Sequence, residues 1–273
     1  MHKIGVILPV YKGDKKDYLE QAIDSILQQT YQNFIIFIGV DGPVPENIRS
    51  YLRSLEMCSQ IQIMWFSDNC GLASRANELI EKARLLGCDY YARMDADDIS
   101  LPERFEKQVN FLKAHPAIDV VGCAISEIDE NGHSRHKIIM YPQSHVECRK
   151  FFARRNPHAH PAVMFRHSYF EKAGCMYRSE YRRNQDTMLW FDGMMTGTQH
   201  ANLPDVLLKY RITNEMFKRR RNGWAFAKKQ FADRLRINRG LGYGVGADFF
   251  GFAMFCMLVS PSWVKKIAYR VFR

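Results

Sequence analysis

The chain has 273 residues, 47% of them hydrophobic, which suits one large domain or one domain with an appendage. Lys and Arg number 39 against 29 Asp and Glu, for a net charge of +10. The seven Cys are scattered and form no Cys-x-x-Cys pair, which argues against a disulfide framework or zinc cluster and favours a reducing compartment. The first residues already have a strand-like pattern, so we expect no signal peptide.

The positive charge is concentrated at the C-terminal end. Residues 216–273 hold thirteen Lys and Arg against Asp233 and Asp248, a balance of +11, which leaves −1 for residues 1–215. We therefore expect a near-neutral domain at 1–215 and a basic tail at 216–273. A basic tail has two ready partners, nucleic acid and an anionic membrane surface.

The first half of the chain alternates between apolar runs and amphipathic segments. The pattern predicts strands at 4–10, 34–40, 61–66 and 90–94, and helices at 17–27, 48–55, 72–86 and 102–114. Asp17 and Glu20 resemble a capping box for the first of these helices, and Pro102 suits the first turn of the last. Regular alternation of this kind predicts an α/β fold with a mostly parallel, doubly wound sheet.

From residue 118 onward the pattern changes. A strand is expected at 120–128, and the turn signal at 129–132 predicts that the next segment pairs back as a hairpin. His158 and His160 form a His-x-His pair that can bind metal, although no carboxylate or Cys partner is evident beside it. Asp186 is expected at the start of a helix, either as a functional carboxylate or as an N-terminal cap.

Three carboxylates, Asp95, Asp97 and Asp98, follow the fourth expected strand within four residues. Carboxylates at the end of a buried strand cost free energy unless a cation pairs with them. In doubly wound sheets, ligands bind outside the carboxyl ends of the strands, where Asp41 and Asp95 both stand. The stretch is either a site for a hard divalent ion that also grips substrate phosphates, or a solvated turn that caps the next helix.

Seven short motifs follow one another between residues 4 and 221. They are Ile-Leu-Pro-Val-Tyr (7–11), Val-Asp-Gly (40–42), Asn-Cys-Gly-Leu-Ala-Ser-Arg-Ala-Asn (69–77), Arg-Met-Asp-Ala-Asp-Asp-Ile-Ser-Leu-Pro-Glu-Arg-Phe (93–105), His-Pro-Ala-Val-Met-Phe-Arg (160–166), Gln-Asp-x-x-Leu-Trp (185–190) and Leu-Leu-Lys-Tyr-Arg (207–211). In this order they resemble the motifs of family 2 glycosyltransferases, which have the nucleotide-sugar-binding GT-A fold. Two departures stand out. The usual Glu-Asp dyad is Gln185-Asp186, and a substrate-closing loop with His and Ser is replaced by Ile-Thr-Asn-Glu-Met-Phe-Lys after Arg211.

The resemblance implies an inverting, metal-dependent transfer of a hexose or N-acetylhexosamine from a UDP-sugar. Asp95 and Asp97 would hold Mn²⁺ or Mg²⁺, which bridges the two phosphates and stabilises the departing diphosphate. Asp98 would support the ion from behind, contact the donor sugar, or only cap a helix. Asp186 would be the base for the acceptor hydroxyl, so that an α-linked donor gives a β-linked product.

The resemblance also implies a nucleotide-sugar site beyond these aspartates. Its further residues would be Pro9, Tyr11, Asp41, Asn69, Gly71, Arg75, His160 and Arg211. The first two would line the base pocket, and Asp41 would accept a hydrogen bond from a pyrimidine ring. Arg75 would meet phosphate, beside a loop shaped by the Asn and Gly, unless it is an exposed helical residue. His160 and Arg211 would lie near the donor or be structural.

The tail combines basic clusters with apolar runs. Cations at 219–221 and 228–229 lead into a basic amphipathic segment, and 247–259 is mostly apolar but shorter than the roughly 20 residues of a spanning helix. Aromatics and cations interleave at 261–273. We expect helices that lie in an anionic membrane interface. The alternatives are a helical hairpin packed on the domain, and nucleic-acid binding, which no recognised module supports.

A membrane-surface transferase of this family implies a lipid-linked acceptor. We therefore expect a cytoplasmic enzyme, peripheral on the inner face of a bacterial inner membrane. Its acceptor would be a polyprenyl-diphosphate-linked or lipopolysaccharide glycan.

Other classes fit the sequence less well. The absence of Gly-x-Gly-x-x-Gly and of a P-loop argues against a dehydrogenase or P-loop kinase. A sugar-phosphate nucleotidyltransferase normally has a Gly-rich loop with Arg and Lys after its first strand, which residues 11–14 are not. A haloacid-dehalogenase-like phosphatase expects Thr or Val where Ile99 stands. A non-catalytic membrane-associated binding protein has no need for Asp95, Asp97 and Asp186 together.

Overall fold

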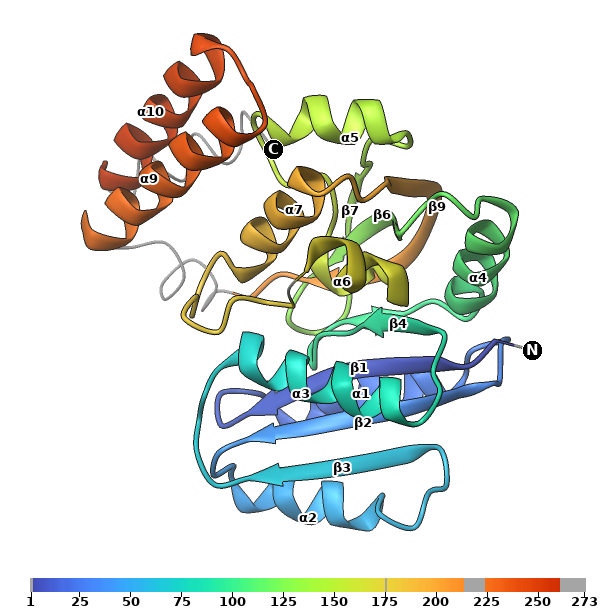
Figure 1. The fold of residues 1–273 in the computed structure, drawn as a ribbon. Coiled ribbons are helices and arrows are strands. Elements are labelled where there is room, and N and C mark those ends of the chain that lie inside the picture. The colour runs from blue at the N-terminus through green and yellow to red at the C-terminus, as the bar shows by residue number, and fades with distance from the viewer. Residues whose placement is uncertain (1, 175, 214–223, 261–273) are drawn as a thin grey trace.

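The computed structural model describes residues 2–174, 176–213 and 224–260, and within them one sheet of nine strands lies between two layers of helices (Figure 1). The first half comprises β1 (Ile4–Tyr11), α1 (Lys16–Leu27), β2 (Phe34–Asp41), α2 (Glu46–Ser54), β3 (Ile61–Phe66), α3 (Leu72–Leu85), β4 (Tyr90–Arg93), β5 (Ile99–Ser100) and α4 (Arg104–Ala114). The second half comprises β6 (Val120–Ile128), β7 (Ser134–Ile139), α5 (His145–Phe152), the 3₁₀ turn η1 (His160–Ala162), β8 (Met164–Arg166), α6 (His167–Ala173), α7 (Gln185–Met195), β9 (His200–Arg211), α9 (Trp224–Gly240) and α10 (Val245–Val259).

The first four long strands form the parallel part of the sheet, in the order β3-β2-β1-β4. Alternate side chains of β1 enter different cores. Val6 and Leu8 pack with apolar residues of α1, α2 and α4, whereas Ile7 packs with those of α3, α6 and α7. A strand covered on both faces must be apolar throughout, which is why its sequence is an uninterrupted apolar run. The expected doubly wound α/β architecture is confirmed here.

The second half of the sheet is mixed. Strand β8 runs antiparallel to both β4 and β6, β9 runs parallel to β6, and β5 runs antiparallel to β9. The expected β6–β7 hairpin is confirmed. Strands β5 and β8 have only two and three residues, too few to show a period of two. Sequence periodicity therefore predicted neither of them.

Two helix starts differ from the expectation. The N-cap of α1 is Lys15, with no side-chain cap bond, and Glu20 instead pairs with Lys16 at 2.7 Å. The helix begins at Lys16, one residue before Asp17, so the Asp17 carboxylate lies in the first turn. There its negative charge interacts favourably with the positive end of the helix dipole. Pro102 lies before α4, which starts at Arg104. The capping box that the structure does show is at α5, between Ser144 and Glu147.

The tail is divided between packed and exposed surfaces. On α9, Ala227 and Ile237 are fully buried, and Ile237 belongs to the same core as α3 and α7. Helix α10 lies along α9 at the outer edge of the molecule (Figure 1). Of its side chains, Phe249 and Phe252 are exposed. Helix α9 therefore packs on the domain, which was one of the expected arrangements of the tail. The basic residues 219–221 and the segment 261–273 lie outside the described residues.

Among the described residues, no helix combines the length and the apolar composition needed to cross a membrane.

Candidate functional site

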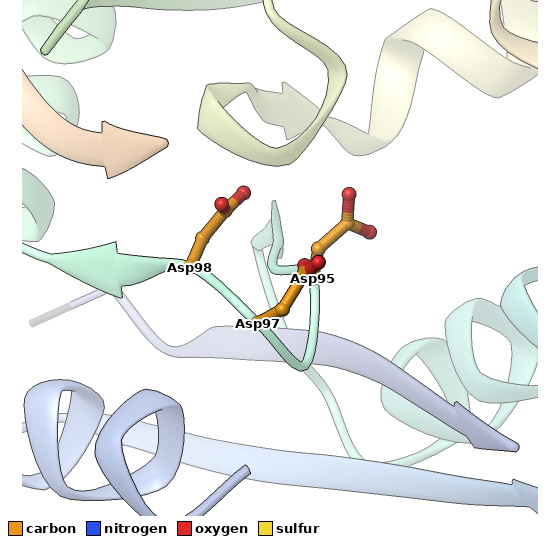
Figure 2. Close-up of side chains that lie close together, drawn as sticks. All are labelled: Asp95, Asp97 and Asp98. Carbon is orange, nitrogen blue, oxygen red and sulfur yellow. The ribbon is translucent and has the colours of Figure 1, made fainter. Parts of the chain in front are cut away.

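The loop between β4 and β5 brings three carboxyl groups together. One oxygen from each of Asp95, Asp97 and Asp98 lies within 4.8 Å of the others (Figure 2). Within the described part of the chain, this is the one His/Cys/Asp/Glu group whose geometry suits a metal ion. The three side chains predicted as a cluster from the sequence are thus adjacent in space.

Asp98 is the buried member of the cluster, with a side chain that is 0% exposed. Its Oδ1 accepts a hydrogen bond of 2.9 Å from the backbone N–H of Arg211, while its Oδ2 has no hydrogen-bond partner among the described residues. Burial, and then the charges of Asp97 and Asp95, raise the pKa of Asp98 well above its ordinary value. An unsatisfied, buried carboxylate oxygen beside two other carboxylates is what an absent cation would leave behind.

The residues present fit a hard divalent ion. Carboxylate oxygens are the ligands that Mg²⁺ and similar cations prefer, and three of them converge from one loop. Asp95 and Asp97 are partly exposed, so a bound ion would also face solvent or a substrate phosphate. With the ion bound, the mutual repulsion of the carboxylates would become attraction to a shared positive charge.

Two buried arginines support this loop, and neither role was predicted from the sequence. Arg93, at the end of β4, pairs with Asp95 and donates to the carbonyl of Ile7 at 3.0 Å. Arg104 donates to the carbonyl of Arg93 at 2.8 Å, and burial lowers its pKa to about 10. Both arginines belong to the quoted motif at 93–105. The rule that buried carboxylates need a cationic partner points to Arg93, two residues before Asp95.

Arg211 is buried and bonded to protein on several sides. Its Nε donates to the carbonyl of Asp97 at 2.8 Å, and its guanidinium donates to Gln21 Oε1 at 2.7 Å. It also donates to the carbonyl of Glu130 at 3.2 Å and stacks over the Tyr18 ring at 4.2 Å. Arg211 therefore fixes the Asp97–Asp98 backbone to α1 and to the β6–β7 turn. A direct contact with the donor stays a prediction.

Asp186 lies in the first turn of α7, as predicted. Burial raises its pKa, while backbone N–H groups of the same turn and a hydrogen bond of 2.9 Å from Asn156 Nδ2 oppose that rise. The charge of Asp95 is close enough to add to the rise, which places Asp186 near the aspartate cluster. Asn156 was not predicted as a site residue. The family's Glu-Asp dyad is Gln185-Asp186 in this chain, and because Gln185 is neutral, Asp186 is its one carboxylate. The raised pKa of Asp186 brings it closer to the range useful for a base.

His160 lies beside the cluster and is neutral. Its Nε2 is 2.7 Å from the Tyr177 hydroxyl, and burial lowers the pKa of its imidazole to about 3, with Arg93 nearby adding to the effect. The backbone of Tyr177 is in turn bonded twice to the Asn77 amide, at 2.7 and 2.9 Å. His160 is thus positioned at the site, and its contact with the donor stays a prediction.

The His-x-His pair does not converge on one point. His158 is buried and bonds to Asn202 Oδ1 at 2.8 Å and to His200 Nδ1 at 3.0 Å. The Asn202 amide N–H groups are donated to two carbonyls, so its oxygen accepts and His158 Nδ1 must carry the proton. His158 Nε2 then accepts from His200. The rings of His158 and His200 thus belong to a buried chain of hydrogen bonds between neutral groups, and they do not form a metal site with His160.

Asp41 terminates β2 and organises the loop after β3. Its carboxylate accepts from the backbone N–H groups of Cys70 and Gly71, each at 2.8 Å, and from Arg75 Nε at 2.8 Å. Asn69 Nδ2 donates to the Asp41 carbonyl at 3.1 Å. Gly71 has φ of +89°, a conformation that glycine adopts without strain. The predicted set Asp41, Asn69, Gly71 and Arg75 is therefore one connected unit.

Arg75 is not an exposed helical residue, since only 3% of it is accessible. It bonds to Asp41 and also pairs with Glu78, and its guanidinium lies 3.7 Å from the centre of the Phe66 ring. In this structure it fixes the orientation of Asp41. Direct contact between Arg75 and a phosphate stays a prediction.

Pro9 and Tyr11 lie at the carboxyl end of β1, next to the end of β2. Tyr11 is paired in register with Asp41, and Pro9 with Gly39. Tyr11 is 44% exposed and Pro9 partly so, which leaves both accessible to a ligand above the strand ends. A base pocket lined by Pro9 and Tyr11 stays a prediction.

These strand ends, with a metal-suited aspartate loop after the fourth parallel strand, define the GT-A class of glycosyltransferase. The crystal structure of S. aureus TarS residues 1–349 in complex with UDP-GlcNAc has a similar fold, with a TM-score of 0.66. That similarity covers 90% of this chain and 72% of the TarS chain, at 13% sequence identity.

The chain belongs to glycosyl transferase family 2, whose family model matches residues 5–174. It is 35% identical over 225 residues to the amylovoran biosynthesis glycosyltransferase AmsE of Erwinia amylovora, and the matching segment covers 82% of each chain. It is 27% identical over 218 residues to the UDP-Gal:alpha-D-GlcNAc-diphosphoundecaprenol beta-1,3-galactosyltransferase of Escherichia coli, covering 80% of this chain and 77% of that one.

The aspartate cluster predicts a thermal response to divalent cations. We expect Mn²⁺ to raise the melting temperature of the wild type, because an ion that binds only the folded state adds about 2.7 kcal/mol at a hundredfold excess over its Kd. Asp97→Ala should abolish this Mn²⁺-dependent shift in differential scanning fluorimetry. Asp205→Asn is the matched control, since Asp205 pairs with Lys107 on the surface. An equal shift in Asp97→Ala and the wild type would contradict the site.

Proposed function

We propose that this family 2 glycosyltransferase is inverting and metal-dependent, and that it uses a UDP-sugar. It would transfer a hexose or N-acetylhexosamine to a sugar hydroxyl of a polyprenyl-diphosphate-linked or lipopolysaccharide acceptor, with formation of a β-glycosidic bond. The observation that supports this most is the presence of two kinds of carboxylate in one site. Asp95, Asp97 and Asp98 form a cluster suited to a cation, and Asp186 is a separate, buried carboxylate that accepts from Asn156 and from the backbone of the first turn of α7.

In the proposed reaction, Asp186 accepts the proton of the acceptor hydroxyl. The hydroxyl oxygen forms a bond to the anomeric carbon of the donor from the face opposite UDP. The bond between that carbon and the diphosphate oxygen breaks, and its electron pair leaves with UDP. A cation held by Asp95 and Asp97 would stabilise the charge of the departing diphosphate. One displacement inverts the anomeric centre.

The environment of Asp41 supports a pyrimidine nucleotide. An ionised carboxylate has about four acceptor positions. Cys70, Gly71 and Arg75 occupy three of them, two on Oδ1 and one on Oδ2. The remaining position on Oδ2 can accept the ring N–H of uracil, with Tyr11 and Pro9 beside it. The E. coli relative is named for a UDP-Gal donor, and the TarS structure contains UDP-GlcNAc, which supports a UDP-sugar for this chain as well.

The surface of the tail supports a lipid-linked acceptor. Helix α9 exposes Lys228, Lys229 and Arg236, and the neighbouring α10 exposes Phe249 and Phe252. Cations beside apolar side chains are the composition of elements that lie in an anionic membrane interface. Together with the undecaprenol-linked acceptor in the name of the E. coli relative, this supports attachment to the cytoplasmic face of a bacterial inner membrane.

Asp186→Asn tests the assignment of the base. We expect transfer to fall by about 10²- to 10⁴-fold, because the amide cannot accept the hydroxyl proton. The Kd for UDP should not change, since Asp41, Asp95 and Asp97 are intact. The assay measures UDP release from UDP-Gal, UDP-Glc, UDP-GalNAc and UDP-GlcNAc with Mn²⁺ or EDTA, in the presence of polyprenyl-diphosphate-linked GlcNAc.

Gln185→Asn is the control, because it shortens the neutral neighbour of Asp186 and leaves the carboxylate in place. Full transfer by Asp186→Asn would show that another group is the base. UDP-sugar binding without turnover by the wild type, for every donor, would instead favour a non-catalytic binding protein.

The pH profile tests the same residue independently. Burial raises the pKa of Asp186, so activity should be lost as the pH falls through a value above that of an ordinary aspartate. The hydrogen bond from Asn156 favours the ionised form, so Asn156→Ala should raise that pKa further and move the acidic limb of kcat to higher pH. Asn47→Ala, on the surface of α2, should leave the limb in place. A limb that stays or moves down in Asn156→Ala contradicts the prediction.

A further inference from the structure

Helix α9 presents one buried carboxylate to the catalytic domain. Asp233 is 6% exposed and accepts a hydrogen bond of 2.9 Å from the Tyr181 hydroxyl at its Oδ1. Its Oδ2 lies 3.4 Å from Asn184 Nδ2. Burial of a carboxylate costs free energy unless such donors compensate. The other carboxylate of the tail, Asp248, accepts from Asn238 at 2.7 Å and so bonds within the helical hairpin.

Both partners of Asp233 belong to the turn that leads into α7. Asn184 is the N-cap of that helix and has φ of +66°, a left-handed conformation that costs free energy for a residue with a side chain. Asp186 follows two residues later. The direction in which α7 starts, and hence the position of the Asp186 carboxylate, depends on this turn keeping its conformation.

Other contacts hold the same turn against α9. Lys229 lies 3.9 Å from the centre of the Tyr181 ring, and Arg183 lies 5.1 Å from that of Phe226. On its opposite side, Arg182 donates to the carbonyl and the side-chain oxygen of Asn69, both at 3.0 Å. The turn at 181–184 is therefore bounded by α9 on one side and by the loop around Asp41 on the other.

Helix α9 is itself fixed to the domain, so that Asp233 is a firm support. Arg234 donates to the carbonyl of Phe152 at 2.6 Å, and Arg149 donates to the carbonyl of Leu241 at 2.9 Å. A Cβ added at Gly240 would lie 2.6 Å from a ring carbon of Phe191 in α7, which shows how closely the end of α9 packs on that helix. Ile237 is fully buried in the same core.

We propose that Asp233 is a positioning residue for Asp186, and that α9 thereby sets the geometry of the base. Asp233 holds Tyr181 and Asn184, these hold the start of α7, and α7 presents Asp186 to the acceptor hydroxyl. The proposal rests on the proposed function, in which Asp186 is the base. It assigns the tail a part in catalysis that is separate from any contact with a membrane.

The test compares four variants of the full chain with the wild type by steady-state kinetics. Asp233→Ala should lower kcat by about 10- to 100-fold, because a displacement of the order of 1 Å at a reacting group costs that much. The KM for the UDP-sugar should stay within about twofold, since the donor residues do not touch Asp233. Asp233→Asn should recover most of the activity, because its amide oxygen still accepts from Tyr181.

Asp248→Asn is the matched control, since it removes the same charge from the same hairpin and should leave kcat unchanged. Tyr181→Phe removes only the hydroxyl that donates to Asp233, so it tests the same contact even if Asp233→Ala does not fold. We expect Tyr181→Phe to lower kcat several-fold with an unchanged KM for the donor and a melting temperature close to that of the wild type.

Wild-type kcat in both Asp233→Ala and Tyr181→Phe would overturn the proposal. An equal fall in Asp248→Asn would also overturn it, since it would point to a general effect of the hairpin. Failure of the proposed function has a different signature. If Asp186→Asn retains full transfer, the base is another group. If Asp186→Asn is inactive while Asp233→Ala is fully active, the base stands and the coupling alone is refuted.

Discussion

The repulsion among three carboxylates held within 4.8 Å is the constraint on which the rest of the site depends. The protein opposes it by pairing Asp95 with the buried Arg93 and by bonding Arg211 to the backbone and side chain of the Asp97–Asp98 segment. Arg211 in turn requires α1 and the β6–β7 turn for its remaining bonds. Elements from both halves of the chain are thus committed to one loop. Asp98 Oδ2 has no hydrogen-bond partner among the described residues, which is consistent with the proposed cation at the cluster.

Around this loop, the two sides of the site are built differently. On the side that we propose for the nucleotide, the Asp41 carboxylate accepts from Cys70, Gly71 and Arg75, and Arg75 orients it. On the side that we propose for the acceptor, Asp186 accepts from Asn156 Nδ2 and from backbone N–H groups of the first turn of α7, and burial raises its pKa. The turn at 181–184 connects the two through Arg182 and Asn69. A fixed Asp41 and a buried Asp186 with a raised pKa suit the proposed function, in which the first side binds UDP and the second accepts a proton.

Sequence patterns located the parts of the site that follow long apolar strands. Asp41 and Asp95 were predicted at strand ends because β2 and β4 read as buried strands; Asp41 ends β2, and Asp95 lies two residues after the end of β4. The motif at 93–105 contained Arg93 and Arg104, but nothing in the pattern showed that they lie beneath the cluster. Strands β5 and β8 were too short to recognise.

Contacts between residues far apart in the chain could not be predicted from sequence patterns. Asn156 is 30 positions from Asp186, and Tyr181 is 52 from Asp233. The tail was expected to be basic and amphipathic. Helix α9 is rich in Lys and Arg, but the burial of its Ile237 does not show in a charge pattern.

Calorimetric titration of UDP, in Mn²⁺ and in EDTA, tests the central claim most directly. The account predicts binding in Mn²⁺ that weakens strongly in EDTA, because the aspartate loop holds the diphosphate through the cation. Equal affinity in both buffers, or no binding in either, would contradict it.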